Sequence, residues 1–271
     1  MKRIYTILTL LFLCSAQLSF AQNDSSFRLV NTYIGDIADA ALDNFGNLYV
    51  ISSQGQIKKF TPTGDSAGVY NQVKKYGNLY SIDVSNPLKL ILFYKEFSTV
   101  VVLDRFFAPL ATLDLRKYSV LQPTAVGLSY DNNIWVFDEY DNKLKKIDEY
   151  GHQLLETPDF RTIFDQSTAP QKIINENGLV YLADSANGVF VFDNYGSYKK
   201  TIPMKSWQSI TVNNHYVIST NNEIVTIYDT NSFMQMQRKT PYFKPYLHSF
   251  THGDKLIIFS NDQLQVYQYR Y

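Results

Sequence analysis

The chain contains four histidines, two of which have the spacing of a metal-binding pair. His248 and His252 are four residues apart, which would place two ligands on one face of a helix. Their segment is instead predicted to be a strand followed by a turn, and four residues of strand span about 13 Å. One zinc ion with bonds of about 2 Å could not reach both side chains. We therefore predict that both of them, like His152 and His215, are solvated histidines near turns.

Carboxylates offer a second route to metal chemistry. Asp39 and Asp83 lie on segments predicted to be the innermost strands of repeated sheets, where carboxylates from several repeats could converge on a divalent ion. Lys172 lies on a third such segment, and its ammonium group would oppose a cation. The same inner segments are otherwise rich in Ser, Ala and Gln. We expect no metal site here, and a metal-dependent hydrolase is the alternative interpretation.

Further catalytic motifs do not emerge from the sequence. Segments 131–133 and 138–142 are rich in Asp and Asn but lack the Asp-x-Asp-x-Asn-Gly run and downstream Glu of a calcium loop. We expect no serine in the Gly-x-Ser-x-Gly setting of a nucleophile elbow and no Gly-rich loop that opens a helix. The sequence therefore predicts no catalytic residue, no metal ligand and no cofactor.

Aromatic side chains in predicted loops are the candidates for binding a partner. These loops connect the outer strand of one repeat to the inner strand of the next, so all of them would lie on one face of the molecule. Exposed aromatic residues are frequent anchors for a protein or peptide. The alternative is that each ring packs between two repeats. The predicted partner-binding residues are Phe160, Phe164, Trp207, Tyr242, Phe243 and Tyr246.

The elements that position these residues follow from an internal repeat. Six strand-like segments begin at residues 57, 100, 144, 189, 224 and 264, so the spacings are 43, 44, 45, 35 and 40 residues. A four-stranded propeller blade repeats every ~40–50 residues. The 21 Tyr and 18 Phe residues favour pleated, half-buried surfaces. We predict an all-β fold, a six-bladed β-propeller of four-stranded antiparallel blades.

The two ends of the chain are predicted to complete one blade. The last repeat ends after its third strand, which would leave an open sheet edge. Residues 27–33 form a strand-like segment that precedes the first complete blade. We therefore predict that 27–33 pairs with 264–270 and closes the ring.

Some repeats resemble a known family. Residues 41–50 read Ala-Leu-Asp-x-x-Gly-x-Leu-Tyr-Val, and residues 126–136 carry a similar pattern, which looks like an NHL-type repeat. The second and fifth repeats depart from it, with Asn86-Pro87 and Asn213-Asn214 at the turn. The chain thus resembles the NHL-like and TolB-like six-bladed propellers. Such folds include both enzymes and binding platforms, so the resemblance leaves function open.

The first 21 residues have the pattern of a secretory signal peptide. Met1-Lys2-Arg3 precedes an apolar run that ends at Leu13, and Ala21 is a suitable cleavage site. A membrane span needs about twenty apolar residues, and this run is shorter. The single cysteine, Cys14, follows Leu13 rather than a small residue, so we expect no lipid anchor. We predict one mature domain, 22–271, located in the periplasm or secreted.

Charge and composition narrow the function further. The 25 basic and 25 acidic residues balance, which gives no basic surface for nucleic acid. An exported propeller without catalytic residues is most simply a binding platform. We predict a protein or peptide partner in the cell envelope, with an accessory role in an envelope complex, such as outer-membrane protein export. The alternative is a metal-dependent, lactonase-like or sugar-processing hydrolase that uses the central channel.

Overall fold

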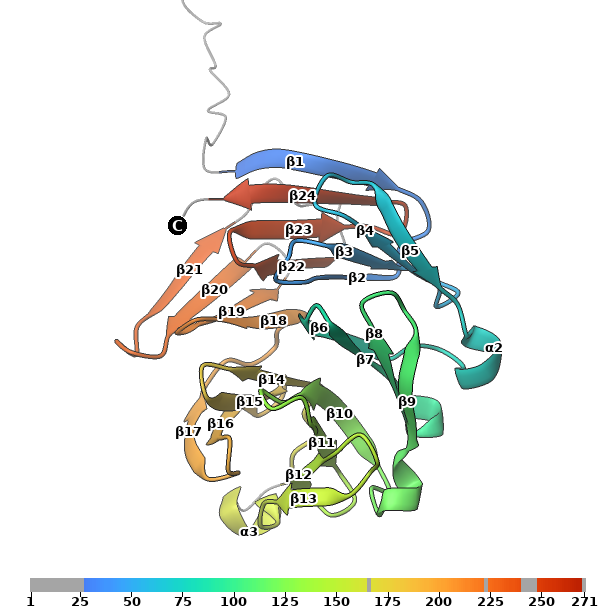
Figure 1. The fold of residues 1–271 in the computed structure, drawn as a ribbon. Coiled ribbons are helices and arrows are strands. Elements are labelled where there is room, and N and C mark those ends of the chain that lie inside the picture. The colour runs from blue at the N-terminus through green and yellow to red at the C-terminus, as the bar shows by residue number, and fades with distance from the viewer. Residues whose placement is uncertain (1–26, 165–166, 222–223, 240–247, 270–271) are drawn as a thin grey trace, which may run out of the picture.

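The computed structural model describes residues 27–164, 167–221, 224–239 and 248–269 (Figure 1). The chain forms six four-stranded antiparallel sheets, which are the six blades of a β-propeller. In each blade the first strand lies nearest the centre of the ring, and the ring surrounds a central channel. The predicted fold class is confirmed.

Blades 1 to 3 follow one another along the chain. Their strands are β2 (Asp39–Leu42), β3 (Leu48–Ile51), β4 (Ile57–Phe60) and β5 (Ser66–Tyr70); β6 (Ser81–Asn86), β7 (Lys89–Tyr94), β8 (Thr99–Asp104) and β9 (Pro109–Asp114); and β10 (Pro123–Leu128), β11 (Ile134–Asp138), β12 (Lys143–Ile147) and β13 (Gln153–Glu156).

Blades 4 to 6 complete the ring. Their strands are β14 (Lys172–Glu176), β15 (Leu179–Asp184), β16 (Gly188–Asp193) and β17 (Tyr198–Ile202); β18 (Ser209–Asn213), β19 (Tyr216–Asn221), β20 (Ile224–Asp229) and β21 (Gln235–Lys239); and β22 (His248–His252), β23 (Lys255–Phe259), β24 (Gln263–Tyr269) and β1 (Phe27–Ile34).

The closing strand is β1, as the sequence predicts. It pairs antiparallel with β24, with Leu29 opposite Tyr267 and Tyr33 opposite Leu264 (Figure 1). One extra residue in β1 shifts the register between Leu29 and Asn31. The sixth blade therefore takes three strands from the end of the chain and one from its beginning.

Each inner strand runs in the same direction along the channel, which gives the disk two distinct faces. The turn face carries the turns from first to second strand and from third to fourth strand. The connection face carries the turns from second to third strand and the links between blades. The short helices lie on the connection face: α2 (Val73–Tyr76), η1 (Lys95–Phe97), η2 (Leu115–Tyr118) and α3 (Phe160–Phe164).

The core lies between adjacent blades, because both faces of the middle strands are covered. In β7 every residue of Leu90–Tyr94 is buried, and in β8 every residue of Val100–Leu103 is buried. Leu92 and Leu103 pack toward blade 1, while the alternate residues pack toward blade 3. An unbroken apolar run of this length is typical of a strand buried on both faces. In the described part of the chain, no helix has the length and apolar character to cross a membrane.

Candidate functional site

The turn face carries a recurring turn in which an aspartate fixes the backbone. In blade 1 the Asp43 carboxylate oxygen Oδ1 accepts hydrogen bonds from the backbone N–H of Phe45 (2.9 Å) and of Asn47 (2.8 Å). Gly46 follows with φ of 81°, the left-handed region that glycine adopts without strain. The turn is held by Asp43 and the backbone, and Phe45 is mostly exposed to solvent.

The same arrangement recurs from the third to the fourth strand of three other blades. An aspartate accepts the N–H groups two and four residues later at 2.8–2.9 Å, and an aromatic residue lies at the second position. A residue with positive φ follows each aromatic residue. At Gly151 a Cβ would also overlap the Tyr118 ring, so glycine is required there. The three aspartate and aromatic pairs are Asp104 with Phe106, Asp148 with Tyr150 and Asp193 with Tyr195.

Two further turns on this face add an exposed ring each. Tyr130 lies between β10 and β11, and Phe233 lies between β20 and β21. We call Phe45, Phe106, Tyr130, Tyr150, Tyr195 and Phe233 the turn-face aromatics. Between 61% and 78% of each residue is exposed. Single exposed apolar residues are ordinary on a protein surface. Here, however, the turns from third to fourth strand in blades 2 to 5 each present one ring, and the turns from first to second strand in blades 1 and 3 present the other two.

Cations lie over three of these rings. Arg105 is 4.5 Å from the Phe106 ring centroid, and Lys200 is 4.7 Å from that of Phe233. Lys146 lies 4.9 Å from the Tyr130 ring, while its ammonium also contacts Asp131 at 2.6 Å. The face therefore combines exposed rings with nearby cations, and aromatic residues and Arg are enriched at protein interfaces.

Three of the predicted partner-binding residues lie elsewhere, beneath the connections between blades. Phe160 is fully buried and stacks on Phe192 with a centroid distance of 5.1 Å. Phe164 packs edge-on against Phe160 and Tyr198. Trp207 is half-buried against the core shared by blades 4 and 5. These three rings pack between blades, which is the alternative to partner binding that the sequence left open. Tyr242, Phe243 and Tyr246 lie outside the described residues.

The central channel forms a cavity with a volume of about 540 Å³. Its wall consists of the inner strands of all six blades. Hydrogen bonds between neighbouring blades surround its turn-face end. Asn44 donates to the Ser85 carbonyl at 2.9 Å, Asn86 donates to Asn132 at 2.9 Å, and His252 contacts Asn44 at 3.0 Å. These bonds join neighbouring blades next to the channel, while the pairing of β1 with β24 joins the two ends of the chain in the outer part of blade 6.

The charged residues expected at the channel are found there. Asp83 Oδ1 accepts the Ser85 N–H at 2.8 Å and its Oδ2 accepts the Leu128 N–H at 2.7 Å, so this carboxylate links blades 2 and 3. Lys172 Nζ donates to the Ile210 carbonyl at 3.0 Å. Desolvation in the channel lowers the pKa of Lys172, and attraction to Asp39 and Asp83 partly offsets this effect.

Histidines do not form a metal site in the described residues, where no group of three or more metal-ligating side chains occurs. His248 begins β22 and His252 ends it, so the pair lies at opposite ends of one strand. His152 is well exposed and contacts the Asp148 carboxylate at 2.9 Å, as expected for a solvated turn histidine. His252 differs from the prediction because it is half-buried in the channel wall, where desolvation lowers its pKa.

The expectation that no serine lies in a Gly-x-Ser-x-Gly motif is wrong, but the motif that is present is structural. Residues 64–68 read Gly-Asp-Ser-Ala-Gly, the letters of a nucleophile elbow. Ser66 begins the outer strand β5 and pairs with Phe60 of β4 in an antiparallel hairpin. A nucleophile elbow requires a strand followed by a helix. The motif therefore has no catalytic geometry.

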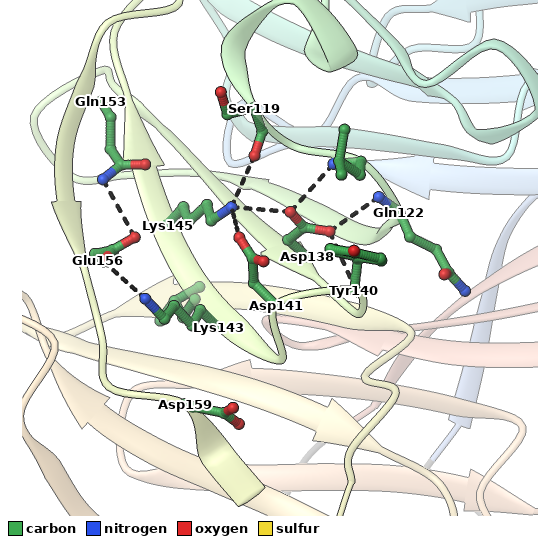
Figure 2. Close-up of polar contacts among 12 residues, drawn as sticks. Ser119, Gln122, Asp138, Tyr140, Asp141, Lys143, Lys145, Gln153, Glu156 and Asp159 are labelled. Atoms are coloured by element: carbon green, nitrogen blue, oxygen red, sulfur yellow. Dashed lines mark hydrogen bonds and ion pairs between the residues drawn. The ribbon is translucent and has the colours of Figure 1, made fainter.

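A buried lysine in blade 3 is the other concentration of charge (Figure 2). Lys145 contacts Asp138 at 2.9 Å, Asp141 at 2.5 Å and the Ser119 carbonyl at 2.9 Å. The side chains of Lys145 and Asp138 are 2% and 0% exposed. Burial opposes the charged form of Lys145, but hydrogen bonds with Asp141 and Asp138 outweigh it and raise the pKa of Lys145.

This cluster has a structural role. Asp138 also accepts the N–H groups of Leu121 and Gln122 at 3.1 and 2.9 Å, so it ties the link between blades 2 and 3 to β11 (Figure 2). Neither Lys145 nor Asp138 is accessible to a ligand. The binding surfaces to consider are therefore the turn face and the channel.

Comparisons with known proteins support the fold alone. No protein-family model matches the chain, and no curated protein matches its sequence. Many solved structures share the fold. The WD40 domain of Pan2 from Neurospora crassa is 13% identical, with a TM-score of 0.64 over 90% of this chain and 96% of that one.

Two further neighbours are an enzyme and a protein solved with a protein partner. A catalytically inactive virginiamycin B lyase from Staphylococcus aureus, solved with quinupristin, is 10% identical, with a TM-score of 0.63 over 90% of this chain and 100% of that one. BBS1N, solved in complex with ARL6DN, is 13% identical, with a TM-score of 0.55 over 90% of this chain and 83% of that one. At these identities the likeness establishes the β-propeller fold and no activity.

Proposed function

We propose that this chain is an exported, non-catalytic binding platform that holds a protein partner in the cell envelope through its turn face. One observation carries the proposal: the same aspartate-fixed turn presents an exposed aromatic ring in blades 1 to 4. Export rests on the signal-peptide pattern of residues 1–21. We also propose that the propeller is of the NHL-like subtype and that it has an accessory role in outer-membrane protein export.

The physical basis is the low cost of ordering these rings. Aromatic residues give a large contact area for few rotatable bonds, and they are enriched among the residues that dominate binding energy. In this chain the turn backbone is already fixed by Asp43, Asp104, Asp148 and Asp193. A partner would therefore meet preorganised anchors and would pay little conformational entropy.

The neighbours in fold do not decide between function classes. Virginiamycin B lyase is an enzyme and BBS1N was solved with a protein, yet both share this fold. The hydrolase alternative needs carboxylates free to hold a metal ion. In this channel the Lys172 ammonium attracts both Asp39 and Asp83, so a cation would meet an existing positive charge. We therefore favour the platform.

The test is affinity purification of the mature protein from its native envelope. A variant with Phe45, Phe106, Tyr150 and Tyr195 changed to Ser should lose at least about thirtyfold in affinity for the partner, which corresponds to ~2 kcal/mol. The matched control changes Phe97 and Tyr140, two exposed aromatic residues of the connection face, to Ser. Equal recovery of the partner by wild type and the turn-face variant would contradict the proposal. The control variant should recover the partner as well as the wild type does.

A further inference from the structure

The central channel contains two opposite charges that face each other without forming an ion pair. Asp39 is the first residue of β2 in blade 1, and Lys172 is the first residue of β14 in blade 4. In a ring of six blades, these two blades lie across the channel from each other. Both side chains are exposed to the lumen. None of the ion pairs within 4 Å among the described residues includes Asp39 or Lys172.

Each group keeps unused hydrogen-bonding capacity. Asp39 Oδ1 accepts the backbone N–H of Ala40 at 2.8 Å, which leaves Oδ2 for a donor. Lys172 donates to the Ile210 carbonyl, which leaves two of its three N–H groups. By contrast, both oxygens of the neighbouring Asp83 are bound to backbone N–H groups. Asp39 and Lys172 therefore both keep hydrogen-bonding capacity for a ligand. They begin their inner strands, whereas Glu176, another carboxylate that lines the channel, lies at the far end of β14.

The channel wall makes both charges costly on their own. Protein surrounds the lumen on all sides, so the exposed side chains are hydrated less than they would be on an open surface. Desolvation raises the pKa of Asp39, and the hydrogen bond from Ala40 and attraction to Lys172 only partly offset it. Lys172 shows the opposite shift for the same reason. A ligand that brings an ammonium to one and a carboxylate to the other would stabilise both charged forms.

The rest of the lumen suits a small ligand with an apolar middle. Ile82, Ile174, Val212 and Phe250 line it together with Ser81 and Thr211. Its volume of about 540 Å³ falls within the ~300–1,000 Å³ typical of small-molecule sites. A second cavity lined by Asp39, Ser81 and His248 opens at the connection-face end and provides an entrance. A pure anion would be repelled by Asp39 and Asp83, and a pure cation by Lys172.

We propose that the central channel is a binding site for a short peptide with free termini, held with its ammonium at Asp39 and its carboxylate at Lys172. This site is separate from the turn face, and it does not depend on the proposed platform function. The peptide would bridge blades 1 and 4 across the lumen. Its side chains would contact the apolar wall between the two charges.

The experiment is isothermal titration calorimetry of the mature protein with the tripeptide Ala-Leu-Ala and with its N-acetylated and C-amidated forms. We expect the free tripeptide to bind at least about tenfold more tightly than either blocked form, because each blocked form loses one charge-assisted hydrogen bond. This part uses the unaltered protein, so it does not depend on the folding of any variant. No binding of the free tripeptide up to about 10 mM would overturn the proposal, as would equal binding of the three forms.

Variants then assign the two ends of the peptide. Asp39→Asn should weaken the free tripeptide at least about tenfold and leave the N-acetylated form unchanged. Lys172→Gln should also weaken the free tripeptide at least about tenfold, and it should leave the C-amidated form unchanged. The control is Lys58→Gln, an exposed lysine on β4 outside the channel, which should change nothing. The variant with Phe45, Phe106, Tyr150 and Tyr195 changed to Ser should still bind the free tripeptide. If it does not, the channel and the turn face are not separate sites.

Discussion

Phe160 and Trp207, in links between blades, are used in the opposite way to the exposed rings of the turn face. On the connection face, Phe160 and Trp207 lie beneath the links between blades and fill space there. On the turn face, Phe45 and Tyr195 extend into solvent from turns that an aspartate already holds. The difference shows that an aromatic residue in a loop is buried where the loop needs a core. It is exposed where hydrogen bonds from backbone N–H groups to an aspartate already define the loop.

Buried charge shows the same contrast. The Lys145 cluster secures the connection between blades 2 and 3, and both of its innermost groups are closed to solvent. Turn-face aspartates act on short local segments instead, and each binds N–H groups within four residues of itself. Stability should therefore be sensitive to changes beneath the connection face and tolerant of changes at the tips of the turn face.

Phe160→Ala should give the largest effect. Its ring is fully buried among Phe137, Phe190 and Phe192, so truncation leaves a cavity between blades 3 and 4. We expect a loss of about 3–5 kcal/mol in the free energy of unfolding. Chemical denaturation would measure this, with circular dichroism as the signal. A loss below about 1 kcal/mol would mean that Phe160 is not a core residue and would remove the contrast between the faces.

Lys145→Met should be nearly as destabilising. The variant leaves the buried Asp138 carboxylate without its cation, and breaking such a pair costs about 3–5 kcal/mol. We expect a loss of about 3 kcal/mol in the free energy of unfolding, because Asp138 still accepts the N–H groups of Leu121 and Gln122. Since the pKa of Lys145 is raised, its contribution is complete at neutral pH and below, and it declines only as pH rises through that raised value.

The matched control is Lys143→Met on the same strand. Lys143 contacts Glu156 at 2.8 Å, but both side chains are partly exposed, so this pair should contribute only about 0–1 kcal/mol. Melting temperatures of the two variants at pH 7 would compare them directly. If both variants lowered the melting temperature equally, burial of Lys145 would not explain its contribution to stability.

Asp193→Ala tests whether the aspartate holds the turn. The variant removes acceptors for the N–H groups of Tyr195 and Ser197, and we expect a loss of about 1 kcal/mol. Asp193→Asn keeps an oxygen at the same position and should restore most of that stability. Hydrogen exchange at Tyr195 and Ser197 would report the turn itself. Equal protection in the wild type and the Ala variant would show that the carboxylate does not hold the turn.

Most of the architecture could be predicted from the sequence, because it depends on local patterns. Turn residues and apolar runs mark each blade, and the missing strand of the last blade required 27–33 to pair with 264–270. The inner-strand positions of Asp39, Asp83 and Lys172 also followed from the repeat. The NHL-like subtype, the signal peptide and the domain boundary at residue 22 stay predictions.

The candidate surface was harder to predict, because exposure of a loop residue depends on distant parts of the chain. Phe160 is buried only because Phe190 and Phe192 of the next blade lie beside it. The turn-face signal was nevertheless present in the sequence. Asp-x-Phe-Gly or Asp-x-Tyr-Gly occurs at 43–46, 148–151 and 193–196. Alignment of the repeats on their aspartates would have shown that an aromatic residue recurs at a position that the turn does not need.

The smallest expected effect is that of Tyr195→Ser, and it is the most direct test of the comparison. Tyr195 is 78% exposed and its turn is held by Asp193, so removing the ring should change the free energy of unfolding by less than about 0.5 kcal/mol. The measurement is the melting temperature of the variant beside that of Phe160→Ala. If Tyr195→Ser lowers it substantially, the ring contributes to folding and the turn face has no free anchors. If the melting temperature is unchanged while partner recovery falls, the ring acts in binding alone. The opposite result for Phe160→Ala, a large loss of stability, would then complete the separation of roles between the two faces.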